Sequence, residues 1–404
     1  MVQATFEFSP LAASATASAS ASATQAPTRN GHRPAHPAGA GADADAIDSV
    51  GFEIGWDHAH HRVTPPLGHL HHPNPVHQGW LAGRAAFGAR SLAATSAVRQ
   101  WLALRLQAWQ QGQAFEGVQV NPSFLARIDA VDCPVSRQLM TLAANLPGDA
   151  TVTRLNPAAA YAAGNLVVLS QRVAAAADAP ADAVTGLSAD EQARLAVLRS
   201  FATPLPHAQA ALLALRVLPP NRVRVINPVQ ALQVMLTLQF LQAGYARRLL
   251  GLAVLMPSSE TRQAFQIFMH TLLARRLSAG QAPDALAMRR AMEDSWADTL
   301  VNRRWQRLVG RLDAAGCELL LQRAAQRGLV VGGGRWLSPV AATDGWALPA
   351  PGGAASSASS RATSRPGAGH SPHTGPGQDQ AAALGTGTAR PGKTRSLGSQ
   401  KLAS

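Results

Sequence analysis

The most informative part of the chain reads DCPVSRQLM over residues 132–140 and TVTRLNPAAAYAAGNLVVLSQRVAAAA over residues 151–177. It mixes turns with short apolar runs, and this mixed character extends upstream to residue 49. Within that region only 91–111 shows clear helical spacing, with Val98, Trp101 and Leu102 among the repeating apolar positions. We therefore expect an α+β domain over 49–177.

The chain changes character after the alanine run at 174–177. We interpret the residues that follow, 178–187, as a linker. Downstream the pattern is almost entirely helical. Ser188 and Glu191 spell a capping box at the start of the first helix. Further helices are predicted over 228–243, 258–277, 283–312 and 313–327, and Gly328 is expected to end the last of them.

Both ends of the chain lack the large apolar side chains that a core requires. Such segments cannot bury enough surface to offset the entropy that ordering costs. We therefore expect a disordered arm at 1–48 and a disordered basic tail at 348–404. The predicted fold class is mainly α with a small α+β part, and the helical domain covers 188–347.

Charge permits a nucleic-acid or anionic partner without proving one. The 404 residues carry 36 Lys and Arg against 23 Asp and Glu, a net charge of +13. The arm contributes −2 and the tail +5, so the expected folded middle carries +10. Two cysteines cannot form a disulfide framework, and no uncharged apolar run is long enough to span a bilayer. These features predict a cytoplasmic protein with no membrane partner.

Several polar and small residues of the informative stretch fall at specific spacings: Cys133-x-x-Ser136, Thr153-Arg154, Tyr161-x-x-Gly164-Asn165-Leu166 and Ser170-x-x-Val173-Ala174. This arrangement resembles that of HNH endonucleases, over about 45 residues. The family site is a β-hairpin followed by a helix that together hold one divalent metal ion. In many members two C-x-x-C pairs form a zinc knuckle that braces the fold. The resemblance implies such a ββα unit here.

The positions that carry the family chemistry are mostly replaced. The resemblance places Ser136, Ser170 and Val173 where three of the four zinc cysteines belong, and leaves only Cys133. Thr153-Arg154 stands at the D-H or D-R pair, while Ala174 and Ala177 replace the final metal ligand and the lysine. Metal-assisted phosphodiester hydrolysis needs a general base and hard metal ligands, and one cysteine cannot hold zinc. We expect no catalytic residues and no resident cofactor.

Three residues remain as the HNH-like remnant: Cys133, Arg154 and Asn165. We interpret Asn165 as structural, with a side chain that ties loop backbone to the hairpin. Arg154 either contacts a phosphate or is a surface arginine with no partner. Cys133 is expected to be a small buried hydrophobe.

Seven of the 13 histidines lie between residues 58 and 77. Imidazole is a common ligand of transition metals, so the cluster is a candidate site for an adventitious divalent metal. Four prolines in the same segment favour a solvated loop instead. The candidate ligands are His58, His60, His61, His69, His71 and His72.

Arginine pairs recur in the helical domain, and 300, 304, 307, 308 and 311 approximate one helical face. Such a face can lie along phosphates, or it can be an ordinary solvated face. Only two of the 36 basic residues are lysines, so the basicity also fits a GC-rich coding bias. The candidate nucleic-acid contacts are Arg154, Arg172, Arg304, Arg307 and Arg311.

Three functions remain open at this point. The first is a non-catalytic binding protein, associated with DNA or RNA, that retains an inactive HNH-like scaffold. The second is a protein-interaction module in which a helical groove binds a protein partner. The third is metal binding through the histidine cluster.

Overall fold

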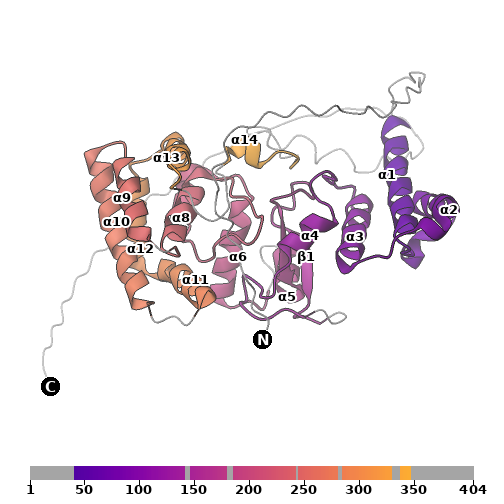
Figure 1. Ribbon diagram of the computed structural model, residues 1–404, viewed down its shortest axis with the longest axis horizontal. Coiled ribbons are helices and arrows are strands. Elements are labelled where there is room, and N and C mark those ends of the chain that lie inside the picture. Colours follow the sequence, from indigo (N-terminus) through magenta and orange to yellow (C-terminus); the bar gives the residue numbers. More distant parts are fainter. Residues whose placement is uncertain are drawn as a thin grey trace, which may run out of the picture. The chain divides into compact units, whose positions relative to one another are not determined.

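The computed structural model describes residues 41–141, 146–179, 185–242, 244–280, 284–329 and 337–346. The tail expected at 348–404 lies outside them. The described chain is mainly helical and contains one two-stranded antiparallel sheet, which confirms the predicted fold class (Figure 1).

The N-terminal part consists of helices followed by loops. α1 begins inside the arm that was expected to end at residue 48, so that boundary was placed too late. α3 begins five residues later than predicted, because the Thr95 hydroxyl caps it by accepting from the Val98 N–H at 3.2 Å. The elements are α1 Gly41–His60, η1 Leu67–His69, α2 Pro75–Phe87, η2 Gly88–Arg90, α3 Ser96–Gln110 and α4 Pro122–Ile128.

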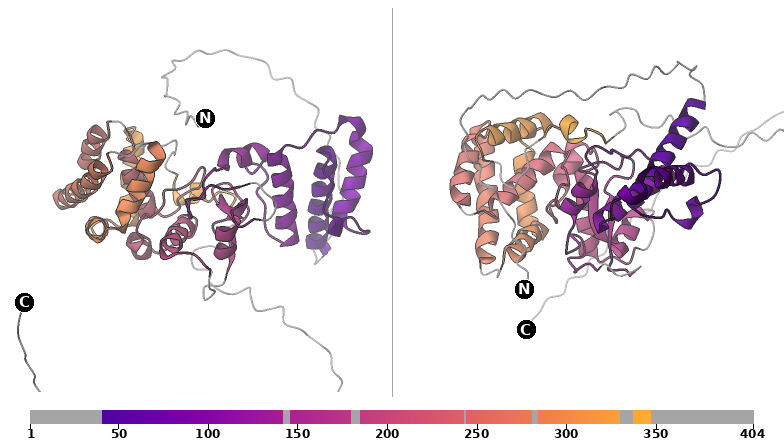
Figure 2. Two further views of the ribbon diagram at one scale, coloured as in Figure 1. Left: turned by 90° about the horizontal axis from the view of Figure 1, so that it is seen from below. Right: turned by 45° about the vertical axis from the view of Figure 1, so that its right-hand side comes forward.

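α1 and α2 pack with their backbones in direct contact, and Figure 2 shows them side by side. A Cβ atom on Gly79 would stand 1.9 Å from the carbonyl oxygen of Phe52, and one on Gly55 would stand 2.0 Å from that of Val76. Only glycine allows this approach. Ile54 and Val76 bury the base of the pair against Leu106 of α3.

The sheet and the helix after it form a ββα unit. β1 Ala150–Arg154 pairs antiparallel with β2 Leu166–Ser170, and α5 Gln171–Asp178 follows β2 directly. β2 is buried along its whole length, since α5 and the N-terminal helices cover it. The alanine run before the expected linker belongs to α5, and its members Ala174, Ala176 and Ala177 lie on the buried face of that helix, where small side chains permit close packing.

The second half of the chain is helical as predicted. The capping box at Ser188 is present, and Asp313 caps the last long helix before Gly328, which has φ +64°. The predicted helix over 283–312 is wrong, because Asp298 accepts from the N–H groups of Leu300 and Val301 and starts a new helix. The elements are α6 Ala189–Phe201, α7 His207–Leu212, α8 Pro228–Gln239, α9 Tyr245–Val254, α10 Ser259–Ser278, α11 Ala285–Asp294, η3 Ser295–Ala297, α12 Thr299–Val309, α13 Ala314–Gln326 and α14 Pro339–Ala342.

One hydrophobic core joins the ββα unit to the helical half. Leu169 and Val173 belong to the same buried cluster as Phe201 and Phe268, on the other side of the expected linker. At its far end the rings of Phe268, Trp296 and Trp305 meet with centroids 5.5–5.7 Å apart. The segment at 178–187 therefore connects two parts of a shared core.

The glycine contact between α1 and α2 yields a stability prediction. Gly79→Ala forces the added methyl group into the backbone of α1, and overpacking of this kind costs about 1–3 kcal/mol. Urea denaturation followed by circular dichroism is expected to show that loss. Gly68→Ala is the matched control, since a Cβ there meets nothing within 4 Å. Equal stability of the two variants would contradict the close packing.

Candidate functional site

Three of the four positions that the HNH resemblance matches to zinc cysteines lie close together: Cys133, Ser136 and Ser170. The Ser170 hydroxyl, at the end of β2, lies 3.6 Å from the Cys133 sulfur. Ser136 lies on the turn that Cys133 opens, and the Arg137 N–H closes this turn on the Cys133 carbonyl at 2.8 Å. Val173, in the first turn of α5, is buried in the same cluster as Cys133. We call residues 132–137 the knuckle turn.

Cys133 is fully buried, as expected. Burial opposes ionisation of its thiol, but hydrogen bonds from Ser136 and Ser170 outweigh this effect and hold the pKa of the thiol below its ordinary value. The hydroxyl groups of Ser136 and Ser170 stand at positions that the HNH resemblance matches to zinc cysteines. A single thiol with two hydroxyls is a poor set of zinc ligands.

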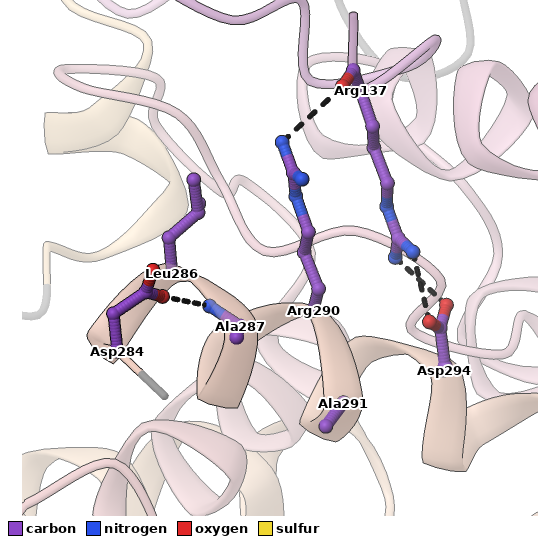
Figure 3. A pocket seen from close by; sticks show the side chains of 7 residues that line it. All are labelled: Arg137, Asp284, Leu286, Ala287, Arg290, Ala291 and Asp294. Atoms are coloured by element: carbon purple, nitrogen blue, oxygen red, sulfur yellow. Dashed lines mark hydrogen bonds and ion pairs between the residues drawn. The ribbon is translucent and has the colours of Figure 1, made fainter. Parts of the chain in front are cut away.

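Ion pairs attach the knuckle turn to the helical half (Figure 3). The guanidinium of Arg137 makes a bidentate contact with Asp294, with both distances 2.8 Å, and lies 3.2 Å from Glu293. Arg290 donates to the Arg137 carbonyl at 3.3 Å, and Arg194 donates to the Val135 carbonyl at 2.6 Å. Arg137 adopts φ +59°, which is unusual for a residue with a side chain, so these contacts hold a strained turn.

The positions that the HNH resemblance matches to catalytic residues carry side chains that do not bind a metal well. Thr153 pairs with Val167 in the hairpin, and Ala174 is buried in α5. Asn165 is completely buried, and its side chain bonds the backbone of Asn156 and Ala160 at 2.8–3.0 Å. The predicted structural role of Asn165 is confirmed.

Arg154 is occupied within the chain. Its guanidinium donates to the carbonyls of Pro157 and Ala159 and to Gln113 at 2.9–3.0 Å, and lies 4.4 Å from the centre of the Tyr161 ring. The expectation of a surface arginine with no partner was wrong, because the loop between the strands supplies carbonyl partners, and the phosphate contact stays a prediction.

Arg172 is also engaged. It extends from α5 to the capping carboxylate of Glu191 on α6, at 2.5 Å. This arginine lowers the pKa of Glu191 to about 2. The pair joins the ββα unit to the helical half, so Arg172 contributes to the junction.

The predicted arginine face on α12 needs correction. Leu308 is buried and Arg304 is half-buried, so the expected face is not wholly exposed. Arg307 and Arg311 are exposed, and Arg303, which sequence reasoning left out, is exposed beside them. We call Arg303, Arg307 and Arg311 the arginine stripe. Their i, i+4, i+8 spacing was the signal that identifies Arg303.

The arginine stripe lacks acidic partners. Among the described residues no Asp or Glu forms an ion pair with any of its members, and the Arg311 guanidinium donates to the Arg307 carbonyl. Trp296 and Trp305 are fully buried, which agrees with the expectation that they anchor the core.

The histidines between residues 58 and 77 differ in burial and in the groups that they contact. His58 and His60 are in α1 and His77 is in α2, so the prediction of a loop throughout 58–77 is wrong. His58 is buried and its Nδ1 lies 2.8 Å from the Ile54 carbonyl, while His69 contacts Asn74 and Gln110. Burial lowers the pKa of His58 and His69.

The remaining candidate ligands are not gathered at one site. The His60 ring stacks on Phe87 and lies tilted against His61, whereas His71 and His72 are exposed. Within the described residues no group of three ligating side chains is placed to hold a metal.

The chain matches no family model, no curated protein and no solved structure. In the part that the structure describes, no helix has both the length and the apolar character needed to cross a bilayer.

The Arg172–Glu191 pair predicts that the stability of the fold depends on pH in the acid range. The folded-state pKa of Glu191 is depressed, so its contribution is complete above about pH 4.5 and is lost as pH falls towards 2. We expect Glu191→Gln to be less stable than the natural chain at pH 7, and to lose less stability between pH 4.5 and 2.5. Chemical denaturation at several pH values measures both.

Arg172→Gln removes the other partner of the pair. We expect its stability to depend less steeply on pH over the same range than that of the natural chain. If both variants kept the full slope of the natural chain, the pair would not contribute to stability.

Proposed function

We propose that this chain is a non-catalytic binding protein that associates with nucleic acid and retains an inactive HNH-like scaffold. The observation that carries the proposal is the arginine stripe, with Arg303 and Arg307 on α12 and Arg311 in the turn after it, three exposed cations without acidic partners among the described residues. A duplex presents about one negative charge per 1.7 Å of its axis, and contacts with it release condensed counterions.

The geometry of the stripe suits a phosphate backbone. A helix rises about 1.5 Å per residue, so Arg303 and Arg307 are spaced by about 6 Å along the axis of α12, and Arg311 follows two residues after its end. Arginine offers a planar fork of donors that matches phosphate oxygens. One face of α12 can therefore contact several phosphates of one strand.

The same surface favours backbone contacts over recognition of bases. Trp296 and Trp305 have no exposed ring with which to stack on a base. Phosphate contacts position a protein but carry no sequence information. We therefore propose binding that depends strongly on salt and little on sequence.

The proposal includes no hydrolysis. The hairpin and α5 follow the order that the HNH resemblance implies, but Thr153 and Ala174 supply neither a general base nor a strong metal ligand. A scaffold of this kind can retain a nucleic-acid surface after its chemistry is lost.

Charge removal on the stripe tests the proposal. The triple variant Arg303→Gln, Arg307→Gln, Arg311→Gln is expected to bind a labelled DNA duplex more weakly in fluorescence anisotropy. With all three arginines on phosphates, the slope of log K against log salt falls in magnitude by about 2.7. Titrations between roughly 50 and 200 mM salt measure this slope.

The matched control removes three exposed arginines elsewhere: Arg84→Gln, Arg99→Gln, Arg127→Gln. This variant has the same net charge, so a similar loss in both would attribute binding to overall charge and contradict a site on α12. Absence of binding by the natural chain at low salt would overturn the function itself.

A further inference from the structure

The outer face of α1 carries an aromatic and acidic hollow within a strongly basic chain. Phe52, Glu53, Trp56 and Asp57 line this open pocket of about 380 Å³. The rings of Phe52 and Trp56 lie 6.3 Å apart and nearly parallel, with an interplanar angle of 27°. Phe52 is 36% exposed, although phenylalanine is usually buried.

The carboxylate of Glu53 is available at this hollow. Its side chain is 69% exposed, and its ion-pair contact with Arg105 is long, at 3.9 Å. Asp57 satisfies most of the charge of Arg105, with which it forms a short direct pair. The hollow thus combines an exposed carboxylate with two ring faces, the chemistry that binds an organic cation.

The neighbouring Arg105 already makes both kinds of contact, one with an aromatic ring and one with a carboxylate. Its guanidinium lies 4.8 Å from the centre of the Trp101 ring and pairs with Asp57. Arginines also cover the rings of Trp80, Tyr161 and Tyr245 at 4.4–6.0 Å. Among the described residues no cation lies over the rings of Phe52 or Trp56.

We propose that the hollow on α1 docks an arginine side chain from a peptide segment of a partner protein. The guanidinium stacks on Trp56 or Phe52 while the Glu53 carboxylate accepts its N–H groups. Arginine suits the site better than lysine, because its flat cation both stacks on a ring and donates a fork of hydrogen bonds to a carboxylate.

The net charge of the chain confines the attraction for a basic peptide to the neighbourhood of its exposed acids. The chain has a net charge of +13, so a basic peptide is repelled by the molecule as a whole and gains attraction only beside exposed acids. The Trp56 ring packs on Phe87 of α2 in an edge-type contact, with ring centres 5.0 Å apart and an interplanar angle of 66°. The packing of α1 on α2 therefore fixes one wall of the hollow before any partner arrives.

The test uses the full chain and two fluorescein-labelled hexapeptides, one of alternating glycine and arginine and one of alternating glycine and lysine. Anisotropy at about 50 mM salt is expected to show tighter binding of the arginine peptide. Glu53→Gln and Phe52→Leu are each expected to weaken it about two- to fivefold, the range of exposed ion pairs and cation–π contacts, and their combination about tenfold. Glu260→Gln, an exposed acid on α10, is the matched control and should leave binding unchanged.

Equal affinity for both peptides, or an arginine affinity that Glu53→Gln leaves intact, would overturn the proposal. Dimerisation in sedimentation velocity that Glu53→Gln abolishes would also overturn it, because a second copy would then cover the hollow. Duplex binding by Glu53→Gln is expected to equal that of the natural chain, so failure here is distinguishable from failure of the nucleic-acid function.

Discussion

The buried carboxylate of Glu293 is the group on which the junction between the two halves of the chain depends. It is 4% exposed and accepts from the Leu218 N–H, from Arg289 and from Arg137, at 2.9–3.2 Å. A buried carboxylate without partners costs several kcal/mol, so all three donors must be in place. Their convergence fixes α11 against the knuckle turn and sets the strained backbone of Arg137.

This junction holds the knuckle turn in place. Three arginines, Arg137, Arg194 and Arg290, make the hydrogen bonds that connect the turn to the helical half. Many acids of the helical half are already paired. Asp190, Glu191, Glu293, Asp294 and Asp298 each form an ion pair with an arginine of the chain, whereas among the described residues no acid pairs with the arginine stripe.

Local signals in the sequence predicted much of the fold. The capping box at Ser188, the start of α8 at Pro228 and the end of α13 before Gly328 were identified correctly, because caps and punctuating residues act within one turn. The site residues were harder, because their partners are distant in sequence. Arg137 and Asp294 are 157 residues apart, and nothing in either neighbourhood indicates the other. The helix predicted over 283–312 was wrong because the capping aspartate Asp298 interrupts an otherwise continuous helical pattern.

Placing cysteines at the matched positions tests most directly whether the HNH resemblance of residues 133–173 extends to a zinc knuckle. Tetrahedral Zn–S bonds of about 2.3 Å place sulfurs about 3.8 Å apart, close to the 3.6 Å between Cys133 and Ser170. The variant Ser136→Cys, Ser170→Cys, Val173→Cys is expected to bind one Zn²⁺ per chain, measured by titration with a chromogenic chelator, and to lose it when Cys133→Ser is added. A folded triple variant that binds no stoichiometric zinc, or binds it equally well without Cys133, would contradict the resemblance to a zinc knuckle.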